Sequence, residues 1–166
     1  LRKIDALYGN RVRTLFSDAA SIEAAVKNAD VVIGGVLLPG GSAPKLVSHD
    51  LIRRMRPGSV VVDVAIDQGG CFETSKATTH EHPIYDVDGI MHYCVANMPG
   101  AVARTSTIAL GNATMPFLLA LADRGWKQAC ADDPHLLEGL NVHAGHLTYF
   151  AVGKALGIDV ISPQLA

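Results

Sequence analysis

Apolar residues in the first hundred positions occur in short continuous runs, separated by turns rich in glycine and proline. Three runs stand out: "VVIGGVLL" (31–38) and "SVVVDVAI" (59–66), which are rich in β-branched residues, and "GIMHYCVAN" (89–97). Such runs are typical of strands in a parallel sheet that is buried on both faces. Residues 12–16 form a fourth, shorter strand candidate.

Helical patterns lie between these runs, and polar residues stand where helices begin. Ser17 or Asp18 can cap a helix that extends to about Asn28, and Ser48 can cap a short helix over residues 49–55. The alternation of strand and helix predicts an α/β class with a doubly wound parallel sheet.

The pattern changes after about residue 100. Residues 105–123 read as one long helix that ends at Arg124-Gly125, with Gly111 and Pro116 as places for a kink. Shorter helical segments follow, and only "IDVI" (158–161) gives a strand signal. We therefore predict an α/β part followed by a helical part.

Composition and charge exclude several classes of function. The 166 residues are 49% hydrophobic and have a formal net charge of -2, so no basic surface for DNA or RNA is expected. No continuous apolar run reaches the roughly 18 residues of a membrane span. Three cysteines without metal-type spacing favour reduced thiols and a cytoplasmic location. The first residue is not Met and the start reads as mid-helix, so we expect a fragment with an upstream part missing.

The three strand ends read "GGVLLPGG", "VAIDQGG" and "VANMPG". In open parallel sheets ligands bind beyond the carboxyl ends of the strands, and small residues let a ligand approach the backbone. We expect these three ends to form one cleft, although Gly and Pro also turn chains in any α/β fold. The phosphate-binding pattern G-x-G-x-x-G is absent.

Three polar residues lie within or next to these strand ends, and two of them have alternative interpretations. Asp63, inside the second run, fits a structural carboxylate that accepts bonds from loop N–H groups. Asp67 fits either a carboxylate that exchanges protons with a substrate or a turn-capping residue. Asn97 fits a ligand-binding amide or an Asx-turn. The histidines lack partners at ligand spacing, so no metal site is expected.

Several longer stretches resemble the alanine dehydrogenase family. They are "ADVVIGGVLLPGGSAPKLVS", "MRPGSVVVDVAIDQGGCFETSKATTHEHP", "YCVANMPGAVARTST" and "LGNATMPFLLALADRGW". "AIDQGGCFE" followed by "VANMPGAVARTST" is the specific part, because many NAD-dependent dehydrogenases have a stretch like "MRPGSVVVDVA". A related family, the NAD(P) transhydrogenase α subunits, is expected to differ where Asp67 and Gln68 stand.

The resemblance implies the later part of a Rossmann domain over residues 1–104, followed over residues 105–166 by a connecting helix and C-terminal helices that return to a substrate domain. It implies NAD as cofactor and reversible oxidative deamination of L-alanine to pyruvate and ammonia, in a homohexamer. The glycine-rich loop and the substrate domain's Arg, Lys and His are missing, so we expect no activity from this chain alone. The preference between NAD and NADP stays open. The alternative is a nucleotide-binding module like the transhydrogenase α subunit.

The resemblance also implies roles for individual residues. Asp67 is the expected catalytic acid/base. The expected cofactor-binding residues are Ser17, Val36, Leu37, Val64, Ala65, Ile66, Asp67, Lys76, Val95, Ala96, Asn97 and Met98.

Overall fold

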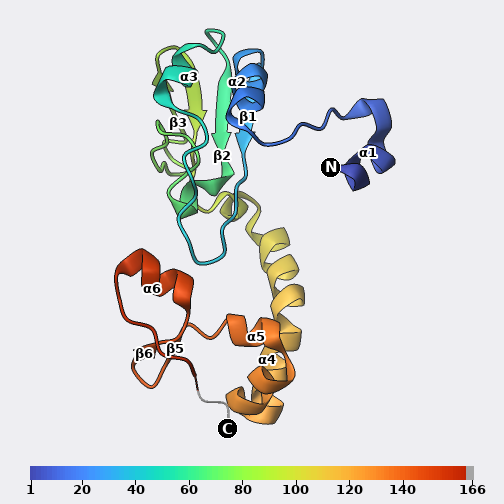
Figure 1. The fold of residues 1–166 in the computed structure, drawn as a ribbon, viewed down its shortest axis with the longest axis vertical. Helices are drawn as coiled ribbons and strands as arrows, with labels where there is room; N and C mark the ends of the chain where they lie inside the picture. The colour runs from blue at the N-terminus through green and yellow to red at the C-terminus, as the bar shows by residue number, and fades with distance from the viewer. Residues whose placement is uncertain (164–166) are drawn as a thin grey trace. The chain divides into compact units, whose positions relative to one another are not determined.

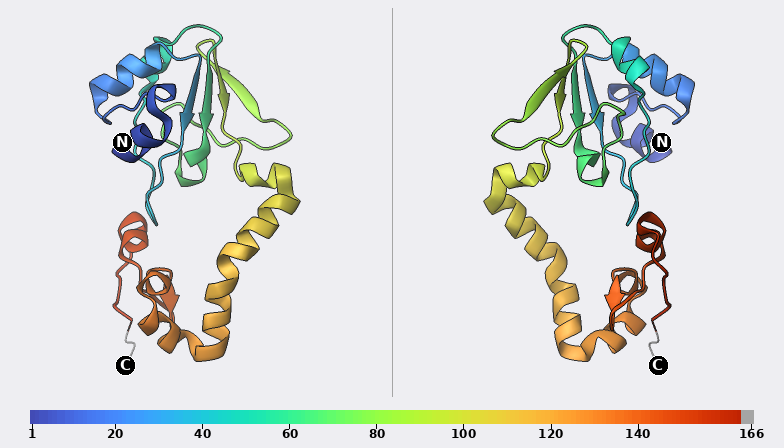
Figure 2. Two further views of the ribbon diagram at one scale, coloured as in Figure 1. Left: turned by 90° about the vertical axis from the view of Figure 1, so that its right-hand side faces the viewer. Right: turned by 90° about the vertical axis from the view of Figure 1, so that its left-hand side faces the viewer.

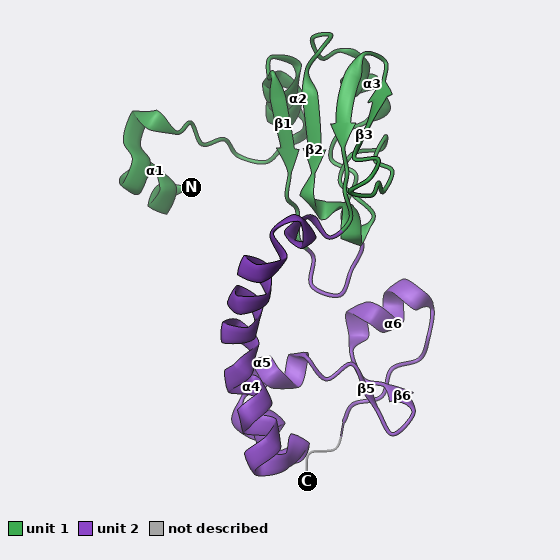
Figure 3. Cartoon of the chain, turned by 180° about the vertical axis from the view of Figure 1, so that it is seen from behind, with its two compact units in different colours: residues 1–37, 43–96 green, residues 38–42, 97–166 purple. Residues whose placement is uncertain are grey.

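The computed structural model describes residues 1–163, and the chain divides into two compact units (Figure 3). The first unit contains residues 1–37 and 43–96, and the second contains residues 38–42 and the chain from residue 97 onward. Each unit is described by itself below.

The first unit is built on a four-stranded sheet (Figure 1). Its strands are β1 (Val31–Gly34), β2 (Val60–Asp63), β3 (Ile84–Val87) and β4 (Ile90–Tyr93), in the order β1-β2-β4-β3. The pairs β1–β2 and β2–β4 are parallel, with Val60 opposite both Val31 and Met91. This sheet confirms the predicted α/β class.

Strand β3 is antiparallel to β4 and was absent from the sequence prediction. The two strands form a hairpin whose turn residues, Asp88 and Gly89, have φ values of 53° and 81°. An Asp-Gly pair between two short runs is a strong hairpin signal, because Gly and Asp tolerate positive φ. Asp86 in the middle of β3 interrupts the apolar run, which concealed the strand.

Two capped helices pack on the sheet. Helix α2 (Ala19–Lys27) begins at Asp18, whose Oδ1 accepts from Ser21 N at 2.9 Å, and α3 (His49–Arg53) begins at Ser48. Together with β2 and β4 they enclose a core that includes Val26, Ile52, Val61 and Ile90. Both predicted helices are thus confirmed. The chain before them forms α1 (Arg2–Tyr8) and a 3₁₀ helix, η1 (Gly9–Arg11).

Other predictions for this unit were wrong. The strands are half as long as the apolar runs, and residues 12–16 form no strand in the described part of the chain. The described residues bury one face of the sheet more fully than the other, and burial on both faces stays a prediction. Val61 is fully buried on the core side, whereas Val31 and Ile33 of β1 are 54% and 68% exposed on the other. The continuous apolar pattern therefore reflects two apolar faces, of which these residues bury one more fully.

The second unit begins with a 3₁₀ helix, η3 (Met98–Val102), which leads into the long helix α4 (Ala103–Asp132). Figure 2 shows that α4 turns sharply toward its end. The break is at Gly125, with φ 72° and ψ 161°, so the predicted helix end there is confirmed. Gly111 and Pro116 keep helical dihedrals within α4, so the helix continues through both, and a kink at either stays a prediction.

The end of the chain contains more than helices. Helix α5 (Pro134–Glu138) precedes a two-stranded hairpin, β5 (Val142–His143) and β6 (His146–Leu147), and helix α6 (Phe150–Leu156) follows. Leu147 also pairs with Val160, within the "IDVI" signal. The purely helical prediction was therefore wrong at this hairpin, where Ala144 and Gly145 form the turn.

Helix α4 with η3, residues Met98–Asp132, is long and apolar enough to cross a membrane by length and composition. None of its most apolar window is buried. A single helix of this kind is weak evidence, because core helices of other proteins pass the same test.

Candidate functional site

The candidate site lies where β1 and β2 end side by side in the first unit. A hollow of about 300 Å³ opens there. Its lining residues are Gly35, Val36, Leu37, Val64, Ala65, Asp67 and Gln68. Five predicted site residues therefore line one hollow at the carboxyl ends of two parallel strands, as the sequence suggested.

The second predicted strand ends earlier than expected, and this decides how the site is built. Strand β2 stops at Asp63, and residues Val64–Gln68 form a 3₁₀ helix, η2. Ala65 and Ile66 of η2 are buried, whereas Val64 and Asp67 are exposed. The tight helix thus sends two side chains inward and presents Asp67 at the hollow.

Asp63 is fully buried and holds the loop that follows β2. Its carboxylate accepts from the backbone N–H of Ala65 at 3.0 Å, from that of Cys71 at 2.9 Å and from the hydroxyl of Ser75 at 2.5 Å. A buried carboxylate needs such partners, because an unpaired buried charge is costly. These contacts agree with the structural interpretation of Asp63. They also explain why the strand ends there, since the side chain caps η2.

The thiol of Cys71 lies against the same carboxylate, with Sγ 3.7 Å from Asp63 Oδ1. Burial and the negative charge of Asp63 raise the pKa of Cys71 to about 11. Around neutral pH this cysteine is a protonated, weak hydrogen-bond donor. It is a structural group and not a nucleophile.

A lysine that the sequence did not single out binds the other side of this loop. Lys45 Nζ donates to the carbonyl oxygens of Gly69 at 2.6 Å, Gly70 at 2.9 Å and Phe72 at 3.1 Å. These acceptors are 24 to 27 residues away in sequence. No local pattern could have shown this contact.

Two other predicted cofactor residues of the first unit lie away from the hollow. Ser17 lines a separate depression at the start of α2. Lys76 donates its backbone N–H to the Tyr85 hydroxyl at 2.8 Å, and its ammonium lies 5.3 Å from the centre of the Tyr85 ring. Burial, with the hydrogen bond between the Tyr85 hydroxyl and the Cys94 sulfur, raises the pKa of Tyr85 above its ordinary value.

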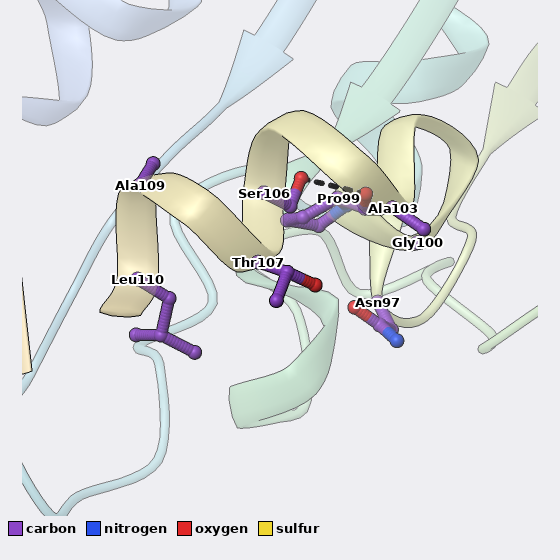
Figure 4. A pocket seen from close by; sticks show the side chains of 8 residues that line it. All are labelled: Asn97, Pro99, Gly100, Ala103, Ser106, Thr107, Ala109 and Leu110. Atoms are coloured by element: carbon purple, nitrogen blue, oxygen red, sulfur yellow. Dashed lines mark hydrogen bonds between the residues drawn. The ribbon is translucent and has the colours of Figure 1, made fainter. Parts of the chain in front are cut away.

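The remaining predicted residues follow β4. Val95 is fully buried and pairs with Thr78, whereas Ala96 is exposed. Asn97 and Met98 belong to the second unit, where Asn97 has φ 54° and ψ 53° and precedes η3. Asn97 lines a hollow of about 650 Å³ beside the first turns of α4, which Figure 4 shows from close by. The hollow that Asn97 lines, after the third strand end, therefore has other lining residues than the hollow at the first two strand ends.

His92 is a buried polar residue that the sequence also did not single out. Its Nε2 lies 2.8 Å from the hydroxyl of Thr74 and its Nδ1 lies 2.9 Å from the carbonyl of Ile90. Its ring stacks on Tyr85 at 5.1 Å. Both nitrogens are used within the protein, so His92 supports the loop after β2. Within residues 1–163, no three His, Cys, Asp or Glu side chains gather as metal ligands do.

Comparisons with known proteins give consistent relatives. Residues 1–150 match the family described as alanine dehydrogenase/PNT, C-terminal domain. The chain is 61% identical over 161 residues to an alanine dehydrogenase of Halomonas elongata, covering 97% of the chain and 43% of that protein. An alanine dehydrogenase of Mycobacterium tuberculosis is 53% identical over 163 residues, with 98% and 44% covered.

Among the solved structures, an alanine dehydrogenase matches this chain better than a transhydrogenase does. An L-alanine dehydrogenase matches with a TM-score of 0.78 and 49% identity, covering 94% of this chain and 43% of that one. A transhydrogenase from Sinorhizobium meliloti matches less well, with a TM-score of 0.50, 33% identity and 54% of this chain covered. The chain spans less than half the length of the curated relatives named above.

Proposed function

The chain belongs to the alanine dehydrogenase/PNT C-terminal-domain family, and we propose that it is part of an NAD-dependent alanine dehydrogenase. The reaction would convert L-alanine, NAD⁺ and water into pyruvate, ammonium and NADH with release of a proton. The observation that best supports this function is the hollow at the ends of β1 and β2, with Asp67 on its wall.

The lining of the hollow fits a nicotinamide nucleotide. Val36, Leu37 and Val64 supply apolar surface, and a Cβ atom added to Gly35 would meet nothing within 4 Å, so a ligand can lie against the backbone there. These residues, with Ala65 of the same lining and the neighbouring Ile66, would hold the nicotinamide and its ribose. NAD, when bound, accepts the hydride from the alanine Cα.

Asp67 is the proposed acid/base of the reaction. After the hydride has left, water adds to the iminium carbon, and the Asp67 carboxylate takes a proton from that water. Asp67 then gives this proton to the amine nitrogen and takes the hydroxyl proton of the carbinolamine as ammonia leaves and the carbonyl of pyruvate forms. The exposed position of Asp67 on η2 gives it access to a substrate in the hollow.

The other cofactor contacts are proposed from the family resemblance. Ser17 would contact the adenosine end, Lys76 the phosphates, and Val95, Ala96, Asn97 and Met98 the nicotinamide end. A homohexamer remains a prediction of the same kind, and a cytoplasmic location remains a prediction from the cysteines.

The test is reduction of NAD by the full-length gene product. We expect NADH formation, followed at 340 nm, to require L-alanine, and the reverse reaction to require pyruvate and ammonium together. Hydride exchange between nucleotides without any dependence on alanine would instead support the transhydrogenase-like alternative. That alternative is the weaker one, because its structural match covers about half of this chain.

A further inference from the structure

The ammonium group of Lys45 makes three hydrogen bonds to one turn of the backbone. Its acceptors are the carbonyls of Gly69, Gly70 and Phe72, at 2.6 to 3.1 Å. An ammonium has three N–H donors, so this turn uses all of them. Lys45 is exposed, but its three charge-assisted bonds fix the ammonium in one place.

Asp63 holds the same turn through other groups. The carboxylate accepts the N–H of Cys71 and the hydroxyl of Ser75, while Lys45 takes the carbonyls. The turn leads directly from η2, because Gly69 N–H donates to Ile66 O at 2.9 Å and Gly70 N–H to Ala65 O at 3.0 Å. A shift of the turn is therefore transmitted to Ala65 and Ile66, the two residues that precede Asp67.

We propose that Lys45 is a positioning residue for Asp67, and this inference rests on the proposed catalytic role of that carboxylate. Without the ammonium, three carbonyl oxygens would converge on one point with no donor between them, and their repulsion would open the turn. Segment 43–47 would still hold the loop through Ala43 N–H to Gln68 O and Leu46 N–H to Cys71 O, at 2.9 and 2.8 Å. The loop therefore stays attached, and the position of Asp67 is what changes.

The experiment uses Lys45→Met in the full-length protein, which keeps the length of the side chain and removes the donors. We expect kcat for alanine oxidation to fall about 10-fold, because small misplacements of catalytic groups reduce rates by one to two orders of magnitude. The dissociation constant of NADH, from its fluorescence, should change less than about 2-fold. Lys27→Met is the matched control, since Lys27 only pairs with Glu23 on the surface of α2; its kcat should equal that of the wild type.

A double-mutant cycle with Asp67→Asn separates positioning from a merely structural role. If Lys45 acts through Asp67, then Lys45→Met should lower kcat less than 2-fold in the Asp67→Asn background. An equal loss in both backgrounds, or no loss in the wild type, would overturn the role of Lys45. Unchanged turnover in Asp67→Asn alone would instead refute the proposed function of Asp67, and the positioning role with it.

A second variant covers the case in which Lys45→Met does not fold. Lys45→Arg keeps the charge, but a planar guanidinium cannot direct three donors to one point as an ammonium does. We expect a folded protein with kcat between those of the wild type and Lys45→Met, again dependent on Asp67. Turnover equal to that of the wild type would contradict the importance of the three-bond geometry.

Discussion

The two units of this chain differ in how much they bury. In the described residues, every buried apolar side chain belongs to the first unit except those of Ala129 and Cys130. Helix α4 instead exposes large apolar residues, among them Leu110 at 65% and Leu118 at 58%. Each unit contains a helix with an Asp N-cap, α2 at Asp18 and α5 at Asp133, so the difference shown here lies in packing.

This difference shows which unit is stabilised by its own packing. The first unit encloses its core between one face of a sheet and two helices, and the candidate site stands at the edge of that core. Apolar surface such as that of α4 is typical of regions that contact other protein surfaces. We therefore expect the first unit to be stabilised mainly by contacts within itself, and the second by contacts with other parts of the intact protein.

The largest effect should come from truncating a core side chain of the first unit. Ile52→Ala should lower the free energy of unfolding by about 4 kcal/mol in this chain, because Ile52 is fully buried and a cavity would remain. Leu118→Ala should change it by less than about 0.5 kcal/mol. Urea unfolding followed by circular dichroism and by hydrogen exchange of β2 would measure both values.

The same pair of variants in the full-length protein sharpens the comparison. Ile52→Ala should cost a similar amount there. Leu118→Ala should cost more than it does in this chain alone if α4 is covered in the intact protein. Equal costs for the two variants in the isolated chain would refute the distinction between the units.

A smaller but still large effect is expected at Gly34, at the end of β1. A Cβ atom there would lie 2.2 Å from Cys71 Sγ and 2.6 Å from a ring atom of Phe72. Gly34→Ala should therefore cost about 3 kcal/mol through overpacking. Gly35→Ala, where a Cβ would meet nothing, is the control and should leave the unfolding midpoint almost unchanged. Similar midpoints for the two variants would show that β1 does not approach the loop so closely.

The third effect depends on pH. The pKa of Cys71 is raised from 9.0 to about 11, so the unfolded chain loses this proton at a lower pH than the folded chain does. Its contribution to stability is present below pH 9 and decreases as the pH rises from 9 to 11, by roughly 2 kcal/mol. Urea unfolding at a series of pH values would show this slope, and Cys71→Ala should reduce it. An identical slope in the variant would exclude Cys71 as its source.

Features that depend on neighbouring residues could be predicted from the sequence. Asp18 and Ser48 cap their helices through bonds to residues three positions later, and Gly125 ends the first part of α4. The end of β2 could not be predicted, because Asp63 is held by Cys71 and Ser75 from a later loop. The contacts of Lys45 were missed for the same reason.

The candidate site was predictable in part. Val36, Leu37, Val64, Ala65 and Asp67 line one hollow because two parallel strands end at the same edge, which periodicity and turn residues already indicate. Periodicity did not indicate the 3₁₀ helix that presents Asp67. A short apolar run has no pattern that distinguishes a strand from a 3₁₀ helix. Here the buried Asp63 ends the strand, because its side chain caps the 3₁₀ helix that follows.

The most direct test of the account is Asp67→Asn in the full-length protein, measured as kcat for alanine oxidation together with the dissociation constant of NADH. The amide keeps the shape of the side chain but cannot take a proton. We predict a loss in kcat of roughly 10²-fold or more, with NADH affinity nearly unchanged. Turnover equal to that of the wild type would contradict the acid/base role of Asp67.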